Sequence, residues 1–115
     1  MAKVFYIHNL ELSSGVTEKE FEKWFKEELP SFSFRPGHKF YLLKGIRGDR
    51  EGQYTLMGEI ESLENYNQGR TPDGQPTESY KKFDEAHPES KIFTDHFFSM
   101  VSITDGESTD YVELD

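Results

Sequence analysis

HKFYLLKGIRGDREGQYTLMGEIES, residues 38–62, is the stretch of sequence that decides the fold. Two runs of extended-type residues flank the short segment GDREG, which begins at Gly48 and ends at Gly52. Glycine lets the backbone turn, and Asp49 favours the same turn. The sequence therefore predicts a β-hairpin. The Arg-Gly-Asp at residues 47–49 is interpreted as the tip of this hairpin and not as an adhesion signal.

The segment before the hairpin predicts a strand followed by a helix. Residues 3–10 (KVFYIHNL) are short, aromatic and β-branched, which is typical of a strand. Thr17 to Glu20 form a capping box, in which the threonine hydroxyl and the glutamate satisfy backbone N–H groups reciprocally. The apolar side chains that follow fall on one helical face: Phe21, Trp24, Phe25 and Leu29. Pro30 ends the predicted helix.

The segment after the hairpin predicts a second, interrupted helical region and a last strand. Ser62 can cap a short helix, and residues 69–76 (GRTPDGQP) break it with two prolines and two glycines. Thr77 restarts helical sequence, which Pro88 is expected to end. We expect residues 91–103 (KIFTDHFFSMVSI) to form the final strand. Residues 104–115 read as a solvated acidic tail. Residues 1–103 are then one domain.

This order of elements predicts an α+β, ferredoxin-like βαββαβ fold. Two helices would pack on one face of a four-stranded antiparallel sheet with the spatial order 4-1-3-2. All four predicted strands carry large apolar groups on both faces, so the uncovered face would be an apolar patch of roughly several hundred square ångströms, more than a monomer usually exposes. We therefore expect a homodimer with its sheets packed face to face.

Composition excludes several function classes. The chain has 115 residues and a formal charge of −9, which argues against nucleic acid as the main partner, because phosphate binding needs clustered Lys and Arg. It has no cysteine, which excludes disulfides and thiolate metal sites. No apolar run approaches the roughly 20 residues that span a bilayer, and no signal peptide is apparent. We expect a cytoplasmic protein without a membrane partner.

The element order, the aromatic first helix (EFEKWFKEELP) and the glycine-punctuated hairpin resemble the dimeric α+β barrel superfamily. That superfamily includes EthD-like proteins, antibiotic-biosynthesis-type monooxygenases and stress-responsive barrel proteins. The resemblance implies a ligand or an oxidisable aromatic substrate, held between sheet and helices or inside the dimer barrel. Haem-degrading members carry an Asn, a Trp and an axial His at particular helix and strand positions. These three residues cannot be placed in this sequence, because Trp24 lies on the core face of its helix and His87 follows the interrupted segment. We therefore expect no bound cofactor.

Alternation along the predicted strands suggests a site. If Phe5 and Ile7 point to the helices, Tyr6 and His8 point away, and on the last strand His96 and Phe98 point away as well. His8 and His96 would then share one surface, as candidate catalytic residues. The other candidate ligand-binding residues on that surface are Tyr6, Tyr41, Met57, Glu59 and Phe98.

Two interpretations of these histidines remain open. A strand histidine is more often a half-buried hydrogen-bonding or dimer-interface residue than a catalyst, and a metal site of His8, His96 and Glu59 lacks the short spacing that usually supports one. The first functional hypothesis is that the protein binds or oxidises a small apolar or aromatic molecule, as a monooxygenase does. The alternative is a non-catalytic binding or regulatory barrel whose sheet face serves only dimerisation.

Overall fold

The computed structural model describes residues 2–69, 71–73 and 75–114 and has the predicted α+β, ferredoxin-like architecture. Its sheet has the strand order β2-β3-β1-β4, and every neighbouring pair is antiparallel. This confirms the expected spatial order 4-1-3-2. The elements are β1 (Val4–Leu12), α1 (Glu18–Glu28), a 3-10 turn η1 (Leu29–Ser31), β2 (His38–Lys44), β3 (Tyr54–Ile60), α2 (Leu63–Gln68), α3 (Glu78–Ala86), α4 (Pro88–Met100) and β4 (Val101–Val112).

The first helix and the hairpin form as their sequences predict. Thr17 caps α1, and its side-chain oxygen accepts a hydrogen bond from the backbone N–H of Glu20 at 3.1 Å. Phe21 and Phe25 point into the core, and Pro30 converts the end of the helix into η1. The β2–β3 hairpin turns through residues 45–53, and Gly48 and Gly52 both have positive φ there, a conformation that glycine adopts without strain.

The segment from residue 88 onward corrects the sequence interpretation. Residues 88–100 form α4, not a strand, and Pro88 begins that helix instead of ending the one before. Phe93, Phe97 and Met100 are buried at i, i+4 and i+7, which is the helical period. The sequence predicts a strand here because this run is apolar and aromatic at many positions, and such runs fit either a helix or a strand.

The last strand therefore begins later than expected and occupies most of the predicted acidic tail. Residues 101–112 form β4, which pairs with β1 through residues 101–103 and 108–112. Its Ser, Thr, Tyr and Val side chains suit a strand, and β1 supplies the hydrogen bonds that its backbone needs. A bulge interrupts the pairing, because His8 lies opposite Ser108 while Leu10 lies opposite Ile103. Residues 104–107 thus lie opposite Asn9.

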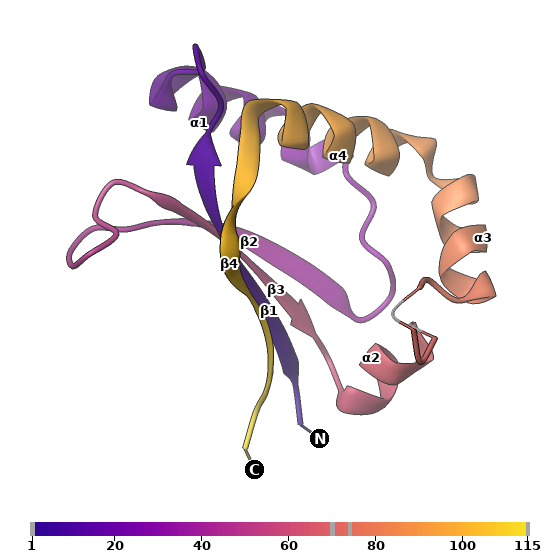
Figure 1. Cartoon of the computed structure of the whole chain (residues 1–115). Coiled ribbons are helices and arrows are strands. Elements are labelled where there is room, and N and C mark those ends of the chain that lie inside the picture. Colours follow the sequence, from indigo (N-terminus) through magenta and orange to yellow (C-terminus); the bar gives the residue numbers. More distant parts are fainter. Residues whose placement is uncertain (1, 70, 74, 115) are drawn as a thin grey trace.

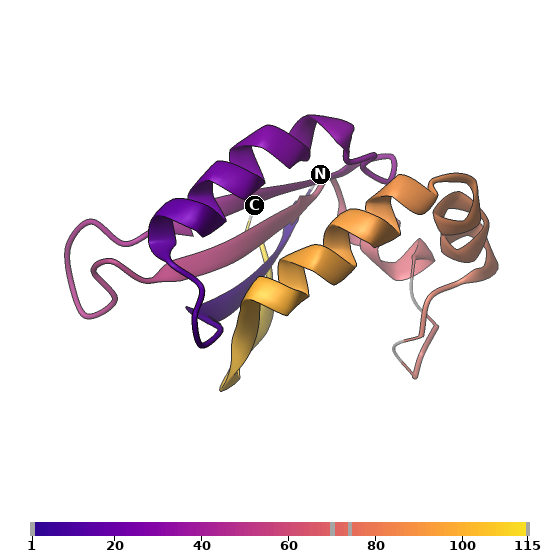
Figure 2. The same cartoon turned by 90° about the horizontal axis from the view of Figure 1, so that it is seen from above.

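The helices α1 and α4 cover one face of the sheet, and the other face is open (Figures 1 and 2). Leu10 is buried in one cluster with apolar residues of α1 and α4, so Tyr6 and His8, which alternate with it on β1, face the helices too. This reverses the assumed assignment, in which Phe5 and Ile7 faced the helices. Alternation alone could not decide the question because both sides of β1 are largely apolar.

The predicted interrupted helical region is confirmed. Ser62 caps α2, accepting a hydrogen bond from the backbone N–H of Asn65 at 3.0 Å, and α3 starts after Thr77. Both short helices lie at one end of the sheet, beyond the start of α4 (Figure 1). They therefore close one end of the space between the sheet and α4. No helix in the described ranges is long and apolar enough to cross a membrane.

Candidate functional site

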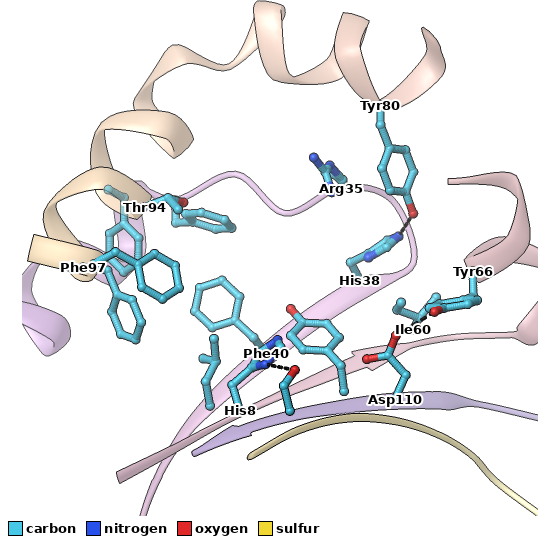
Figure 3. A pocket seen from close by; sticks show the side chains of 16 residues that line it. His8, Arg35, His38, Phe40, Ile60, Tyr66, Tyr80, Thr94, Phe97 and Asp110 are labelled. Carbon is cyan, nitrogen blue, oxygen red and sulfur yellow. Dashed lines mark hydrogen bonds between the residues drawn. The ribbon is translucent and has the colours of Figure 1, made fainter. Parts of the chain in front are cut away.

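A cavity of about 520 Å³ lies between the helix-covered face of the sheet and α4 (Figure 3). One part of its wall is aromatic, and these side chains come from the segment after α1, from β2 and from α4: Phe32, Phe40, Phe93, Phe97 and Phe98. The rings contact one another, and the Phe93 and Phe97 rings stack at a centroid distance of 6.4 Å. The remaining wall is rich in polar groups, so the cavity has an apolar part and a polar part.

His8 lies on the sheet side of the cavity and makes its hydrogen bond with the neighbouring strand. Its Nδ1 lies 2.7 Å from the hydroxyl of Ser108, the residue opposite it on β4. Burial lowers the pKa of His8 below its ordinary value, and the nearby Asp110 carboxylate partly opposes that effect. His8 is therefore neutral at neutral pH. In the tautomer whose Nδ1–H donates to Ser108, Nε2 carries the lone pair and can accept a proton.

The polar part of the cavity is closed by residues from α2, α3 and the start of β2. The Tyr66 hydroxyl donates to a carboxylate oxygen of Asp110 at 2.6 Å. The Tyr80 hydroxyl is hydrogen-bonded to Nε2 of His38. These contacts join segments more than 40 residues apart in the sequence, because α2 and α3 fold back over the end of the sheet (Figure 3).

Arg35 also lies at the polar part of the cavity, and its charge is balanced within the chain. Its Nε and Nη2 atoms donate to the two carboxylate oxygens of Asp84 on α3, at 3.2 and 2.7 Å. The guanidinium group also lies over the Tyr80 ring, 4.2 Å from its centroid. This two-point contact fixes α3 against the segment that precedes β2.

Two tyrosine rings of the cavity lie against glycines. A Cβ atom on Gly58, in β3, would fall within 2.4 Å of the Tyr6 ring, and one on Gly69 would come equally close to the Tyr80 ring. Any larger residue at these positions would displace the rings. Gly58 and Gly69 therefore set where the Tyr6 and Tyr80 rings can lie.

Three of the predicted site residues line the cavity: Tyr6, His8 and Phe98. His96 does not. It is an exposed residue of α4, and its ring stacks on Trp24 at a centroid distance of 4.5 Å. The predicted pairing of His8 with His96 is wrong because the segment that carries His96 is a helix, so strand alternation does not apply to it.

The other predicted ligand-binding residues lie on the opposite side of the sheet. Met57 is paired with both Ile7 and Tyr41, and Glu59 is paired with Phe5 and contacts Lys3 at 3.7 Å. These side chains face away from α1 and α4, so Tyr41, Met57 and Glu59 do not join His8. The reversed face of β1 accounts for this error.

The same arrangement separates the residues of the metal alternative. His8 faces the cavity, Glu59 lies on the other side of the sheet, and His96 lies on α4. Within the described residues, no three His, Asp or Glu side chains are grouped closely enough to hold a metal ion.

Sequence reasoning missed most of the polar wall. Ser108 and Asp110 fell in the predicted tail, and the half-buried His38 was not among the predicted site residues. Tyr66 and Tyr80 lie on the short helices whose packing the sequence did not indicate. One available signal was Gly58, because a glycine in the interior of a strand often marks a close approach by another group.

Comparisons with known proteins support the fold and leave the activity open. No family model matches the sequence, and no curated protein matches it. A solved structure from Bacteroides fragilis, described as a dimeric protein of unknown function with a ferredoxin-like fold, has a TM-score of 0.50 and 15% identity, with 97% of this chain and 96% of that chain covered. The protein At3g17210 from Arabidopsis thaliana has a TM-score of 0.43 and 11% identity over 100% of this chain and 95% of that chain.

Proposed function

We propose that the protein binds a small aromatic or apolar molecule in the cavity between the sheet and α4. The observation that supports this is the cavity itself, whose volume of about 520 Å³ lies within the range of small-molecule sites. Its phenylalanine wall would bury an apolar ring, and the polar groups on the sheet side would orient it. The resemblance to dimeric α+β barrel proteins agrees with a ligand in this place.

His8 is the residue that would act on such a ligand. A neutral imidazole at the floor of an apolar cavity can accept a proton from a phenolic hydroxyl placed within hydrogen-bond distance. In the monooxygenase-like form of this function, His8 would accept the phenolic proton and dioxygen would oxidise the phenol to a quinone, with one oxygen atom entering the ring and the other leaving as water. Binding alone requires neither step, so binding and chemistry are tested separately.

A cavity-blocking variant tests the binding. Thr94 lies on α4 and lines the cavity, whereas the next residue, Asp95, is exposed and does not. With 2-naphthol as a fluorescent probe, Thr94→Trp should abolish binding, and the matched Asp95→Trp variant should bind like the original protein. Binding that survives Thr94→Trp unchanged would remove the cavity as the site.

The histidines provide a second matched pair. His8→Ala should weaken 2-naphthol binding several-fold, the effect of one lost hydrogen bond, whereas His96→Ala should not change it. A substrate screen that monitors oxygen consumption tests the chemistry. Turnover that persists in His8→Ala would exclude His8 as the proton acceptor and leave the binding proposal in place.

A second function is favoured by a separate observation, the open face of the sheet. We define the open face by its apolar residues: Phe5, Ile7, Tyr41, Leu43, Met57 and Tyr111. Tyr41, Leu43 and Tyr111 are 39%, 43% and 52% exposed, which is high for large apolar side chains so close together. We propose that a second copy of the chain covers this face. The dimeric state given for the Bacteroides fragilis protein agrees with this arrangement.

The solution mass tests the dimer. Light scattering should give twice the 13.4 kDa of one chain. Met57→Lys, at the centre of the open face, should reduce the mass to that of a monomer, because two copies would bury unpaired charges against each other. The exposed Lys81→Glu on α3 is the control and should leave the mass unchanged. A monomer in the original protein would exclude this proposal without affecting the cavity.

A further inference from the structure

Among the residues that the structure describes, two charged side chains line the cavity, Arg35 and Asp110, and they have different partners. Arg35 has a carboxylate partner, Asp84, which meets its guanidinium group at two points. Asp110 has the Tyr66 hydroxyl, which is neutral. Among the described residues, no Lys or Arg forms an ion pair with Asp110. The cavity therefore presents a negative charge that the described part of the chain does not balance.

His8 does not supply the missing positive charge. It lies two residues from Tyr6 on β1, and Tyr6 is the residue directly opposite Asp110. Burial keeps the His8 imidazole neutral at neutral pH. The group that would balance Asp110 can then come from a ligand.

We propose that the ligand is an aromatic amine in its protonated form, with its ring on the phenylalanine wall and its ammonium group at Asp110. This deepens the proposed binding function and rests on it. Asp110 and Tyr66 lie next to each other at the polar part of the cavity, joined by their hydrogen bond of 2.6 Å (Figure 3). The ammonium group would donate a charge-assisted hydrogen bond to the Asp110 carboxylate.

The charge of the whole protein acts in the same direction. A formal charge of −9 gives the surface a negative potential, which concentrates cations near the protein and repels anions. A ligand with a carboxylate or phosphate would need Arg35, and it would have to compete with Asp84 for that guanidinium group. The same site thus favours a cation at short range and at long range.

Three probes of similar shape separate charge from aromatic binding. They are 1-naphthylmethylamine, which is a cation at neutral pH, the neutral 1-naphthalenemethanol, and the anionic 1-naphthoate. Titration calorimetry at neutral pH measures their affinities for the full chain. We expect the amine to bind roughly five-fold more tightly than the alcohol, because Asp110 is exposed enough for water to weaken the pair. The naphthoate should bind most weakly.

Asp110→Asn is the decisive variant, because it removes the charge and keeps the size of the side chain. In Asp110→Asn the amine should lose its advantage over the alcohol, and the affinity of the alcohol itself should change less than two-fold. Asp95→Asn on the outer side of α4 removes one charge from the protein without touching the cavity, and the preference for the amine should survive it. Added salt should weaken binding of the amine more than binding of the alcohol.

The possible failures are distinguishable. Equal binding of all three probes would overturn the aromatic amine and leave the proposed aromatic binding function intact. Tighter binding of the naphthoate, lost in Arg35→Gln, would overturn it in favour of an anionic ligand. A preference for the amine that persists in Asp110→Asn would also overturn it. If none of the probes binds, both the inference and the proposed binding function fail.

Discussion

Both faces of the sheet carry large apolar side chains, yet the two faces are used differently. On the helix-covered face, Leu10 and Val101 are 1% exposed, and the side chains that do not pack against the helices surround the cavity. On the open face, Tyr41 and Leu43 remain 39% and 43% exposed. The comparison shows that apolar strand residues alone do not determine which face forms the core. The helices determine it, because each has a single apolar stripe to bury.

The largest contrast between the faces should be in stability. Phe21 is fully buried, so Phe21→Ala should lower the free energy of unfolding by about 3–5 kcal/mol, from lost burial and the space left behind. Tyr41→Ala on the open face should cost less than about 1 kcal/mol in the isolated chain. Urea unfolding of both variants at low protein concentration measures the difference. Equal losses would mean that the open face is already packed, as in a dimer that persists at that concentration.

A smaller contrast is expected at neighbouring positions of β3. Gly58→Ala should cost about 1–3 kcal/mol, because its methyl group would overlap the Tyr6 ring. Glu59→Ala, one residue along on the other face, removes only the partly exposed contact with Lys3 and should cost less than about 1 kcal/mol. Gly58→Ala should also weaken 2-naphthol binding, while Glu59→Ala should not. A Gly58→Ala protein with unchanged stability and binding would show that the Tyr6 ring can move freely.

The smallest expected effect concerns pH. The pKa of His8 is lowered by burial in the folded chain, so the unfolded chain takes up the proton first as the pH falls below about 6.5. The free energy of unfolding is therefore unaffected by protonation of His8 above that pH, and it decreases as the pH falls from there toward the pKa of His8 in the folded chain. After solvent screening we expect a loss of less than about 1 kcal/mol. Urea unfolding at several pH values should show that the free energy of unfolding declines less steeply with falling pH in His8→Gln than in the original protein. If the two declines were equally steep, His8 would not be their cause.

The sequence was sufficient where local signals agreed with one another. The capping box at Thr17, the stop at Pro30 and the glycines of the hairpin each fix one boundary, and together they predicted the order of the strands. Local signals failed at residues 91–103, where aromatic side chains at many positions fit a helix or a strand. Because this segment was predicted as a strand and most of it is a helix, the predicted positions of His96, Ser108 and Asp110 were all wrong.

The candidate site was less predictable than the fold because it depends on contacts between distant segments. Strand alternation made His8 a candidate by placing it on one surface with His96. His8 does line the cavity, but on the helix-covered face of the sheet and without His96. Its partners Ser108 and Asp110 come from the other end of the chain, and no pattern near His8 points to them. Tyr66 reaches Asp110 only because α2 folds over the end of the sheet.

The bulge in β4 determines which side chains of β4 line the cavity. Leu10 follows His8 by two positions on β1, whereas Ser108 follows Ile103 by five positions on β4. The surplus of three positions is odd, so it reverses the alternation of β4 beyond the bulge. Ser108 and Asp110 consequently point to His8 and Tyr66. If the bulge kept its length, the loss of one of its residues would bring Thr109 and Tyr111 opposite His8 and Tyr6 instead, exchanging a carboxylate for a phenol. Evolution could thus change what this protein accepts through chain length alone, with every cavity residue of the other strands and helices left in place.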